Sequence, residues 1–337
     1  MSKRRTFKQL ENERLFSLRE RLFSQDACLR MAESPYLDPV DVMENLHEPI
    51  RKSATSFFNE RNIAGHGVST WDASLTSSQV ACVNCWYPFI DQPDRLKGVL
   101  SEILGDVDEM LPIVDECPLS GGSLPYLTFE WIDRGNRLKE PGRLVRGKYV
   151  TNVDILFHYR ATDGSIKLVL TEWKYRECYA AGSVRYSDRG TDRLAFYLPH
   201  FDSADCQIRL PESVAPADLM YHPFDQLMRL QLLSSILQRD REMNANKVLV
   251  LCIAPRANTE FIRLVHSPKL KELFGNPTTP SVYDTWEALI IKGTFRHFAT
   301  EDLVPLLAKY APTTEYADYV TLRYGGIEDR ILEFERK

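Results

Sequence analysis

The sequence predicts an α/β fold in which helices flank a mixed central sheet. Residues 153–159 and 167–175 have the apolar and β-branched content of two strands, and Asp163-Gly164 between them is typical of a tight hairpin turn. Residues 225–243 carry apolar side chains at helical spacing, and the short apolar run at 247–255 is typical of a buried strand. A hairpin followed by a helix and a further strand favours a sheet covered by helices.

The remaining elements divide the chain into a core and two extensions. Residues 1–71 are charged, carry apolar positions at helical spacing and predict a helical N-terminal extension. In the core, residues 72–256, a serine-capped helix is followed by a second helical stretch at 94–111 and a strand at 123–134. Residues 257–337 alternate helix-like and strand-like pieces and predict an α/β extension packed on the core. The core order is therefore helix, three strands, helix and strand.

The predicted hairpin sets Asp154 against Glu172. If the turn centres on Asp163 and Gly164, the numbers of paired residues add up to about 326 or 327, so the two acids lie opposite each other to within one position. Cross-strand Cβ atoms are about 5 Å apart, and like charges at that distance destabilise a sheet unless a cation lies between them. Lys174 is two residues after Glu172, so strand alternation places its ammonium on the same face. The pattern predicts two carboxylates and a lysine that converge where a divalent cation would bind.

Composition indicates an ordinary globular protein. The 337 residues are 44% hydrophobic and 26% charged, which suffices for one large or two smaller domains. No apolar run reaches the roughly 18 residues of a membrane span, and the N-terminus lacks the apolar segment of a secretory signal, so a cytoplasmic protein is expected. Seven scattered cysteines favour reduced thiols. Cys82 and Cys85 have the spacing of half a zinc site but lack a second pair, which favours core packing.

Positive charge gathers around the acidic pair. The net charge of −5 argues against a protein that coats nucleic acid indiscriminately. Residues 134–193 nevertheless hold 13 Lys and Arg against 7 Asp and Glu. Cations on such loops would hold a phosphate backbone without reading base sequence, and a solvated surface is the alternative. The predicted nucleic-acid contacts are Arg137, Lys139, Arg143, Arg146, Lys148, Arg185 and Arg189.

The order of elements, with Asp154 on the second strand and Glu172-x-Lys174 on the third, resembles the PD-(D/E)XK nuclease superfamily. Within that superfamily, the chain is similar to the restriction-endonuclease-like proteins of bacteria, over residues 72–255. Val153 stands where the name-giving proline precedes the aspartate, a position at which many members vary. The resemblance implies a restriction-endonuclease-like core with the catalytic groups on the hairpin.

Residues outside the hairpin also carry the resemblance. Gln226 and Arg229, three positions apart on the following helix, are similar to a helix motif of several members and would position a loop or the phosphate. The segment around Gln79 and the strand with Glu130 resemble upstream parts of one subgroup. A third acidic group is expected at Glu130, with Glu102 and Glu109 on the preceding helix as alternatives.

The resemblance implies a metal-dependent endodeoxyribonuclease that hydrolyses phosphodiester bonds in restriction or another defence against foreign DNA. Asp154 and Glu172, with Glu130 as a third carboxylate, would bind Mg²⁺, for which Mn²⁺ is expected to substitute. Lys174 would orient or help to deprotonate the attacking water and stabilise the phosphate. DNA is the expected partner, with RNA as an alternative, and a homodimer would supply two active sites for cutting both strands.

Two other functions fit the same residues. A nuclease fold without activity would bind nucleic acid through the same basic surface. A metal-dependent hydrolase of a small phosphoester would use the same carboxylates, but its activity would lack the salt dependence of several phosphate contacts. As a structural alternative, Lys174 and one carboxylate would form an ion pair at a sheet edge, although the apolar strands argue against an edge position.

Overall fold

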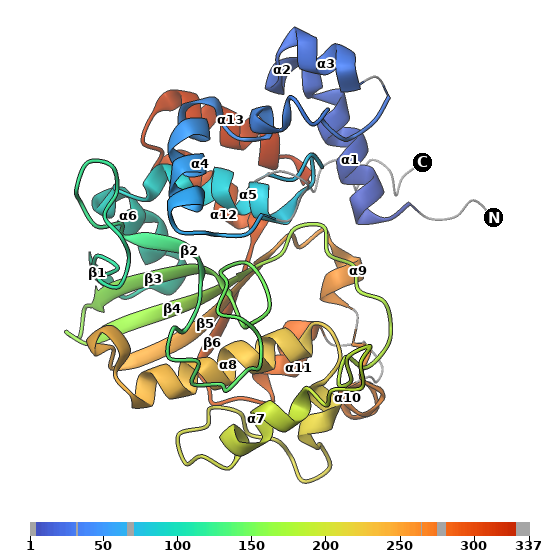
Figure 1. The fold of residues 1–337 in the computed structure, drawn as a ribbon, viewed down its shortest axis with the longest axis vertical. Helices are drawn as coiled ribbons and strands as arrows, with labels where there is room; N and C mark the ends of the chain where they lie inside the picture. Colours follow the sequence, from blue (N-terminus) through green and yellow to red (C-terminus); the bar gives the residue numbers. More distant parts are fainter. Residues whose placement is uncertain (1–4, 32, 66–70, 264, 275–280, 328–337) are drawn as a thin grey trace.

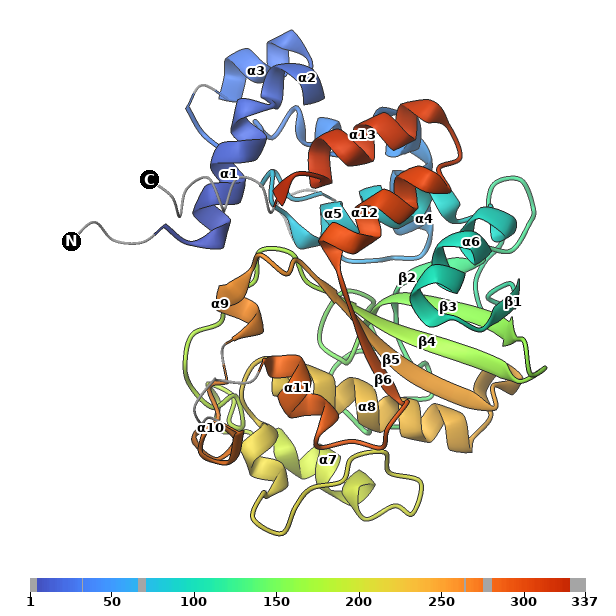
Figure 2. The same ribbon diagram turned by 180° about the vertical axis from the view of Figure 1, so that it is seen from behind.

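The computed structural model describes residues 5–31, 33–65, 71–263, 265–274 and 281–327. In this part of the chain, six strands form one mixed sheet, and helices cover both of its faces (Figures 1 and 2). The predicted α/β fold with a helix-flanked mixed sheet is confirmed. Within the same ranges, no helix combines the length and the apolar content that crossing a bilayer requires.

Antiparallel pairing builds one half of the sheet and parallel pairing the other. The strands are β1 (Val107–Met110), β2 (Leu127–Trp131), β3 (Val153–Ala161), β4 (Ile166–Trp173), β5 (Lys247–Ala254) and β6 (Phe295–Ala299). They follow the order β1, β3, β4, β5, β6, and β2 also pairs with β3. β3 runs antiparallel to β1, β2 and β4, whereas β4, β5 and β6 run parallel to one another. β3 and β4 are therefore interior strands, not edges.

The hairpin of β3 and β4 has the register that the sequence predicts. Ile155 pairs with Thr171, so Asp154 and Glu172 are the residues that come next along the two strands in this register. In the turn, Gly164 has a φ of 79°, a left-handed conformation that glycine adopts without the steric penalty of a Cβ. The turn residue thus fixes the pairing that brings the two acids together.

One face of the sheet is covered by helices from both ends of the chain. These are α4 (Arg51–Glu60), α5 (Ser78–Trp86), α6 (Pro93–Leu104), α12 (Thr300–Lys309) and α13 (Thr314–Tyr324). Alternate residues of β3, namely Ile155, Phe157 and Tyr159, are fully buried against this layer. Figures 1 and 2 both show α12 and α13 beside α4 and α5, so the N-terminal and C-terminal segments form one layer.

The opposite face packs on helices from the middle of the chain. These are α7 (Leu194–Phe201), α8 (Phe224–Arg239), α10 (Pro268–Phe274) and α11 (Val282–Glu287), with the short α9 (Thr259–Ile262) beyond the end of β5. Leu156 of β3 and Leu168 and Leu170 of β4 are buried on this side. The predicted helix at 225–243 is confirmed as α8, and the strand that follows it as β5.

The N-terminal helices form a smaller unit with a core of its own. They are α1 (Phe7–Ser17), α2 (Arg19–Leu22) and α3 (Gln25–Met31), and buried apolar residues such as Leu15 and Met31 join them. Arg14 of α1 donates hydrogen bonds to the backbone carbonyls of Arg323 and Gly325 at the end of α13. The helical N-terminal segment therefore contacts the C-terminal layer directly.

β1 differs from the sequence prediction, and the C-terminal segment contributes directly to the sheet. Gly105, with a φ of 85°, ends α6 after Leu104, so residues 107–110 form β1 instead of the last turn of the predicted helix at 94–111. β6, from the C-terminal segment, joins the sheet beside β5, so this segment supplies a strand as well as helices that pack on the core. The boundaries at 71/72 and 256/257 remain predictions.

Candidate active site

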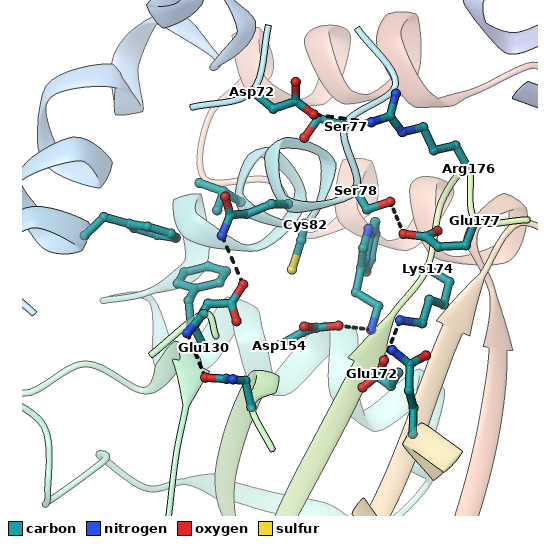
Figure 3. A pocket seen from close by; sticks show the side chains of 18 of the residues that line it. Asp72, Ser77, Ser78, Cys82, Glu130, Asp154, Glu172, Lys174, Arg176 and Glu177 are labelled. Atoms are coloured by element: carbon teal, nitrogen blue, oxygen red, sulfur yellow. Dashed lines mark hydrogen bonds and ion pairs between the residues drawn. The ribbon is translucent and has the colours of Figure 1, made fainter. Parts of the chain in front are cut away.

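Three carboxylates lie in one row across neighbouring strands. Phe129 pairs with Ile155 and Trp131 pairs with Val153, so Glu130, which lies between them, is beside Asp154 on one edge of β3. The hairpin register places Glu172 beside Asp154 on the other edge. Figure 3 shows the three side chains around one pocket, with Lys174 next to Glu172. The predicted register of the hairpin, which brings the two acids side by side, is confirmed, and β2 adds a third acid to the row.

The two acids of the hairpin have different partners. The Asp154 carboxylate accepts a hydrogen bond of 2.7 Å from the backbone N–H of Trp173. The Lys174 ammonium lies 2.5 Å from a Glu172 oxygen, and both of these side chains are 8% exposed. Lys174 and Glu172 therefore share one face, as strand alternation predicts. The buried ion pair neutralises Glu172 but leaves Asp154 with only partial compensation.

Glu130 reaches the pocket through an unusual backbone conformation. Its φ is 49°, a left-handed value that costs a non-glycine residue about 1–3 kcal/mol. The side chain accepts a hydrogen bond of 3.0 Å from the Gln79 amide of α5, and the backbone carbonyl accepts one of 3.2 Å from Arg146. Contacts on both sides thus hold Glu130 in a conformation that turns its carboxylate toward the pocket.

Burial and the neighbouring charges together raise the pKa values of three groups in the site. Burial raises the pKa of Asp154 well above its ordinary value, and the neighbouring Glu172 and Glu130 raise it further. Burial lowers the pKa of Lys174, but the adjacent Glu172 carboxylate and other nearby acidic groups outweigh this effect and raise it overall. The lysine is therefore an ammonium at neutral pH. Burial, with Asp154 nearby, also raises the pKa of the Cys82 thiol, which makes it a poor nucleophile.

The carboxylates and Lys174 line a pocket of about 360 Å³ between α5 and α8. The predicted residues Gln226 and Arg229 of α8 also line it. Gln226 accepts a hydrogen bond of 3.0 Å from the Tyr179 hydroxyl. Arg229 donates one of 3.1 Å to Thr151. The structure therefore brings together the hairpin acids, Lys174, Glu130 and both polar residues of α8.

The donor set of the pocket fits a magnesium-sized ion. Among the described residues, no three His, Cys, Asp or Glu side chains are already arranged around a metal position. Mg²⁺ needs only one or two protein carboxylates, because waters and substrate phosphate complete its shell. Asp154 and Glu172 offer these on adjacent strands. Burial first, and then Glu172 and Glu130, raise the pKa of Asp154, and a cation beside it would favour its charged form. Cys82 and Cys85 are both buried free thiols.

Several polar residues of the site escaped the sequence analysis. Glu177 lines the pocket and accepts hydrogen bonds from the Ser78 hydroxyl (2.5 Å) and the Tyr175 N–H (2.6 Å). The Tyr179 ring lies 6.0 Å from the Lys174 ammonium and stacks on His222 at 4.5 Å. The one signal in the sequence for Glu177 and Tyr179 is that they follow Lys174 by three and five positions. Only the fold shows that the chain turns back over the pocket after β4.

The predicted nucleic-acid contacts fall into two groups. Lys139, Arg143, Lys148 and Arg189 are exposed. Arg137 instead forms ion pairs with Asp133, Asp240 and Glu242, and Arg185 pairs with Asp192 at 2.7 Å. The four exposed cations remain available to a phosphate backbone, whereas Arg137 and Arg185 already have carboxylate partners.

Arg146 lies inside the protein, which corrects its prediction as a surface contact. It is 8% exposed and pairs with the Glu116 carboxylate at 2.8 Å. It also donates hydrogen bonds to Thr128 and to the backbone carbonyls of Phe129 and Glu130. Its guanidinium therefore joins the basic loop to β2, and a phosphate cannot take the place of these partners without breaking them.

Replacing Arg146 with methionine is expected to lower the free energy of unfolding by about 3 kcal/mol, because Glu116 would keep its buried charge after losing its closest cationic partner. Urea denaturation followed by circular dichroism would measure this. The exposed Arg143→Met on the same loop is the control and should change stability by less than about 0.5 kcal/mol. If Arg146→Met left the stability unchanged and weakened DNA binding, Arg146 would be a surface contact to DNA and not a buried ion-pair partner.

The two alternative acids on the predicted preceding helix lie outside the pocket. Glu102 of α6 is paired with Lys309 of α12 at 2.7 Å. Glu109 is on β1, not on a helix, and is paired with Arg160 at 3.1 Å. Neither residue lines the pocket, so Glu130 is the one that remains of the three acids predicted as the third acidic group.

Comparison with known protein families finds a match over most of the chain. The profile of a family described as "Restriction Endonuclease associating with ARP" matches residues 17–325. Neither the comparison with curated proteins nor the comparison with solved structures found a match. The matched range includes the whole sheet, the hairpin acids and the helices on both faces. The chain therefore belongs to this restriction endonuclease family.

Proposed function

We propose that the protein is a metal-dependent endodeoxyribonuclease of the PD-(D/E)XK type, which hydrolyses phosphodiester bonds of foreign DNA. Family membership implies a nuclease that acts on DNA in defence. The finer proposal rests on one observation, the row of Glu130, Asp154 and Glu172 with the Lys174 ammonium beside it in a single pocket. Two acids and a lysine at these strand positions are the pattern that the superfamily's name describes.

Asp154 and Glu172 would hold Mg²⁺ or Mn²⁺, with Glu130 as a third carboxylate. When bound, the ion would make a water nucleophilic near neutral pH and offset charge on the phosphate. Lys174 keeps its proton because of Glu172, so its role is that of a fixed positive charge. We assign to it the orientation of the water and the stabilisation of charge on the phosphate, not the removal of a proton.

Gln226 and Arg229 of α8 line the same pocket as the carboxylates and would contact the phosphate together with the metal and Lys174. A guanidinium has five N–H donors, so Arg229 can donate to Thr151 and to a phosphate oxygen at the same time. The Tyr179 hydroxyl donates a hydrogen bond to the amide oxygen of Gln226. This bond fixes the amide plane and therefore the direction in which the N–H₂ group can donate. Positioning of this kind lowers the barrier because the reacting phosphate need not be reoriented after binding.

The wild-type protein is expected to relax and linearise supercoiled plasmid with Mg²⁺ or Mn²⁺, and EDTA should stop the reaction. If the four exposed cations each contact a phosphate, affinity should fall roughly 100-fold between 50 and 200 mM salt. Gel electrophoresis and fluorescence anisotropy would measure cleavage and binding. Binding without cleavage under either metal would support an inactive module. Hydrolysis of a small phosphodiester that plasmid does not inhibit would support a small-molecule hydrolase.

Assembly partners also belong to the proposal. The description of the family names an association with ARP, and we extend that association to this chain. A homodimer would place two pockets on one duplex, as cleavage of both strands commonly needs. Gel filtration with and without DNA would test the dimer, and a monomer under both conditions would contradict it.

A further inference from the structure

Tyr149 is an exposed aromatic residue held in an unfavourable backbone conformation. Its side chain is 66% exposed, so it takes no part in a hydrophobic core. Its φ is 73°, in the left-handed region that bulky residues rarely adopt. Such conformations persist only where the surrounding contacts determine them, and they concentrate at ligand-binding positions. The residue is therefore presented to solvent by its loop and is not stabilised there by burial.

The backbone around Tyr149 is held by close contacts with the rest of the fold. A Cβ at Gly142 would collide with the Tyr149 carbonyl oxygen, so the loop crosses itself where only glycine fits. Gly147 has a φ of 85°, and its N–H donates a hydrogen bond of 2.7 Å to Asn152. The buried Arg146 ties the loop to β2. The loop is thus a defined support for the exposed ring.

This loop forms part of the rim of the candidate active site. Gly147, Val150 and Asn152 line the pocket that contains the three carboxylates, so Tyr149 is two positions or fewer from its wall. Lys148 is exposed, and its ammonium lies 5.8 Å from the Tyr149 ring. Arg143, at the start of the loop, is exposed as well. A flat ring beside an exposed ammonium, on a loop that also lines a pocket suited to a phosphate, matches the parts of a nucleotide.

We propose that Tyr149 stacks on an unpaired nucleobase of the DNA beside the cleaved phosphate. This inference rests on the proposed function and names the feature of the substrate that the site recognises. Lys148 and Arg143 would hold the flanking phosphates, while the ring offers a face to any base without reading its identity. A base inside an intact duplex has no free face, so the site engages a single strand or a locally opened duplex.

The experiment uses the full chain with Lys174→Met, which silences cleavage, and a single-stranded oligonucleotide with 5-iododeoxyuridine in place of thymidine. Irradiation joins this base to an aromatic side chain stacked on it, and mass spectrometry of peptides identifies that side chain. The expected crosslink is at Tyr149. Adding Tyr149→Leu should remove it and weaken binding of the single strand roughly 5- to 150-fold, whereas Tyr149→Phe should keep both.

Tyr186 provides the matched control. Like Tyr149 it is an exposed tyrosine next to a cation, since it is 59% exposed and its ring lies beside Arg185. Its segment, closed by the bridge between Tyr186 and Asp192, adds no residue to the pocket. Tyr186→Ala should leave the Tyr149 crosslink in place. The parent chain is the one that carries Lys174→Met alone. If it binds the oligonucleotide but forms no crosslink at Tyr149, or if adding Tyr149→Leu leaves its affinity unchanged, the inference is overturned while the proposed function stands. A parent chain that binds no DNA would overturn the proposed function together with it.

Discussion

A protein with methionine in place of Lys174 is expected to bind DNA but to cleave it at least about 100- to 1,000-fold more slowly than the wild type. The ammonium lies 2.5 Å from Glu172 and keeps its proton there, so it is the fixed positive charge of the pocket. Methionine retains the length and apolar stem of lysine but removes the charge that would face the phosphate. Single-turnover cleavage of plasmid with saturating protein and Mg²⁺ would measure the loss.

Lys167→Met is the matched control for this variant. Lys167 is on β4, the strand that Lys174 directly follows. It is 8% exposed and forms an ion pair with Asp106, but it lies outside the pocket. Both substitutions remove a buried ammonium from a carboxylate, so both should destabilise the fold, and circular dichroism would set the temperature at which each stays folded. Only Lys174→Met should lose cleavage. Equal activity of the two variants would exclude a catalytic role for Lys174.

The hairpin is the part of the site that the sequence predicts best, and local physics explains this. The Asp163-Gly164 turn fixes the register within a few residues, so the positions of Asp154 and Glu172 follow from counting along the strands. Strand alternation then places Lys174 on the face of Glu172. α8 was equally predictable, because its apolar pattern extends over four turns. Each of these inferences uses contacts that are near in sequence.

The features that the sequence did not reveal depend on distant contacts. Arg146 resembles its exposed neighbours in the basic loop, and only its pairing with Glu116, thirty positions earlier, makes it interior. The left-handed conformation of Glu130 has no glycine or asparagine to indicate it. β6 has a short and weakly alternating pattern, so its place beside β5 becomes visible only when the sheet is assembled. Composition near a site therefore overstates how many of its charges face solvent.

Asparagine in place of Asp154 is expected to abolish cleavage and to raise the stability of the metal-free protein. Loss of a proposed metal ligand removes several kcal/mol of transition-state stabilisation, so the rate should fall on the order of 1,000-fold or more. The fold should persist, since the amide oxygen of asparagine can still accept the hydrogen bond from the Trp173 N–H. Stability should rise at neutral pH because the variant removes a carboxyl group whose charged form is disfavoured first by burial and then by the neighbouring Glu172 and Glu130.

The pH dependence of this gain follows from the raised pKa of Asp154. As pH rises above the ordinary value of 3.8, the unfolded chain gives up this proton before the folded protein does, so the aspartate's contribution to stability is progressively lost. The advantage of Asp154→Asn in EDTA should therefore be small near pH 4 and grow toward neutrality, as thermal unfolding would show.

The turn residue Asp163 offers a control of opposite sign. Its exposed carboxylate accepts hydrogen bonds from Ser165, which lower its pKa, so its contribution to stability is present above the ordinary pKa and lost as the pH falls. Asp163→Asn should therefore lower stability at neutral pH. If Asp154→Asn melts below the wild type at pH 7 in EDTA, the three carboxylates do not repel one another, and the charge argument for a bound cation fails.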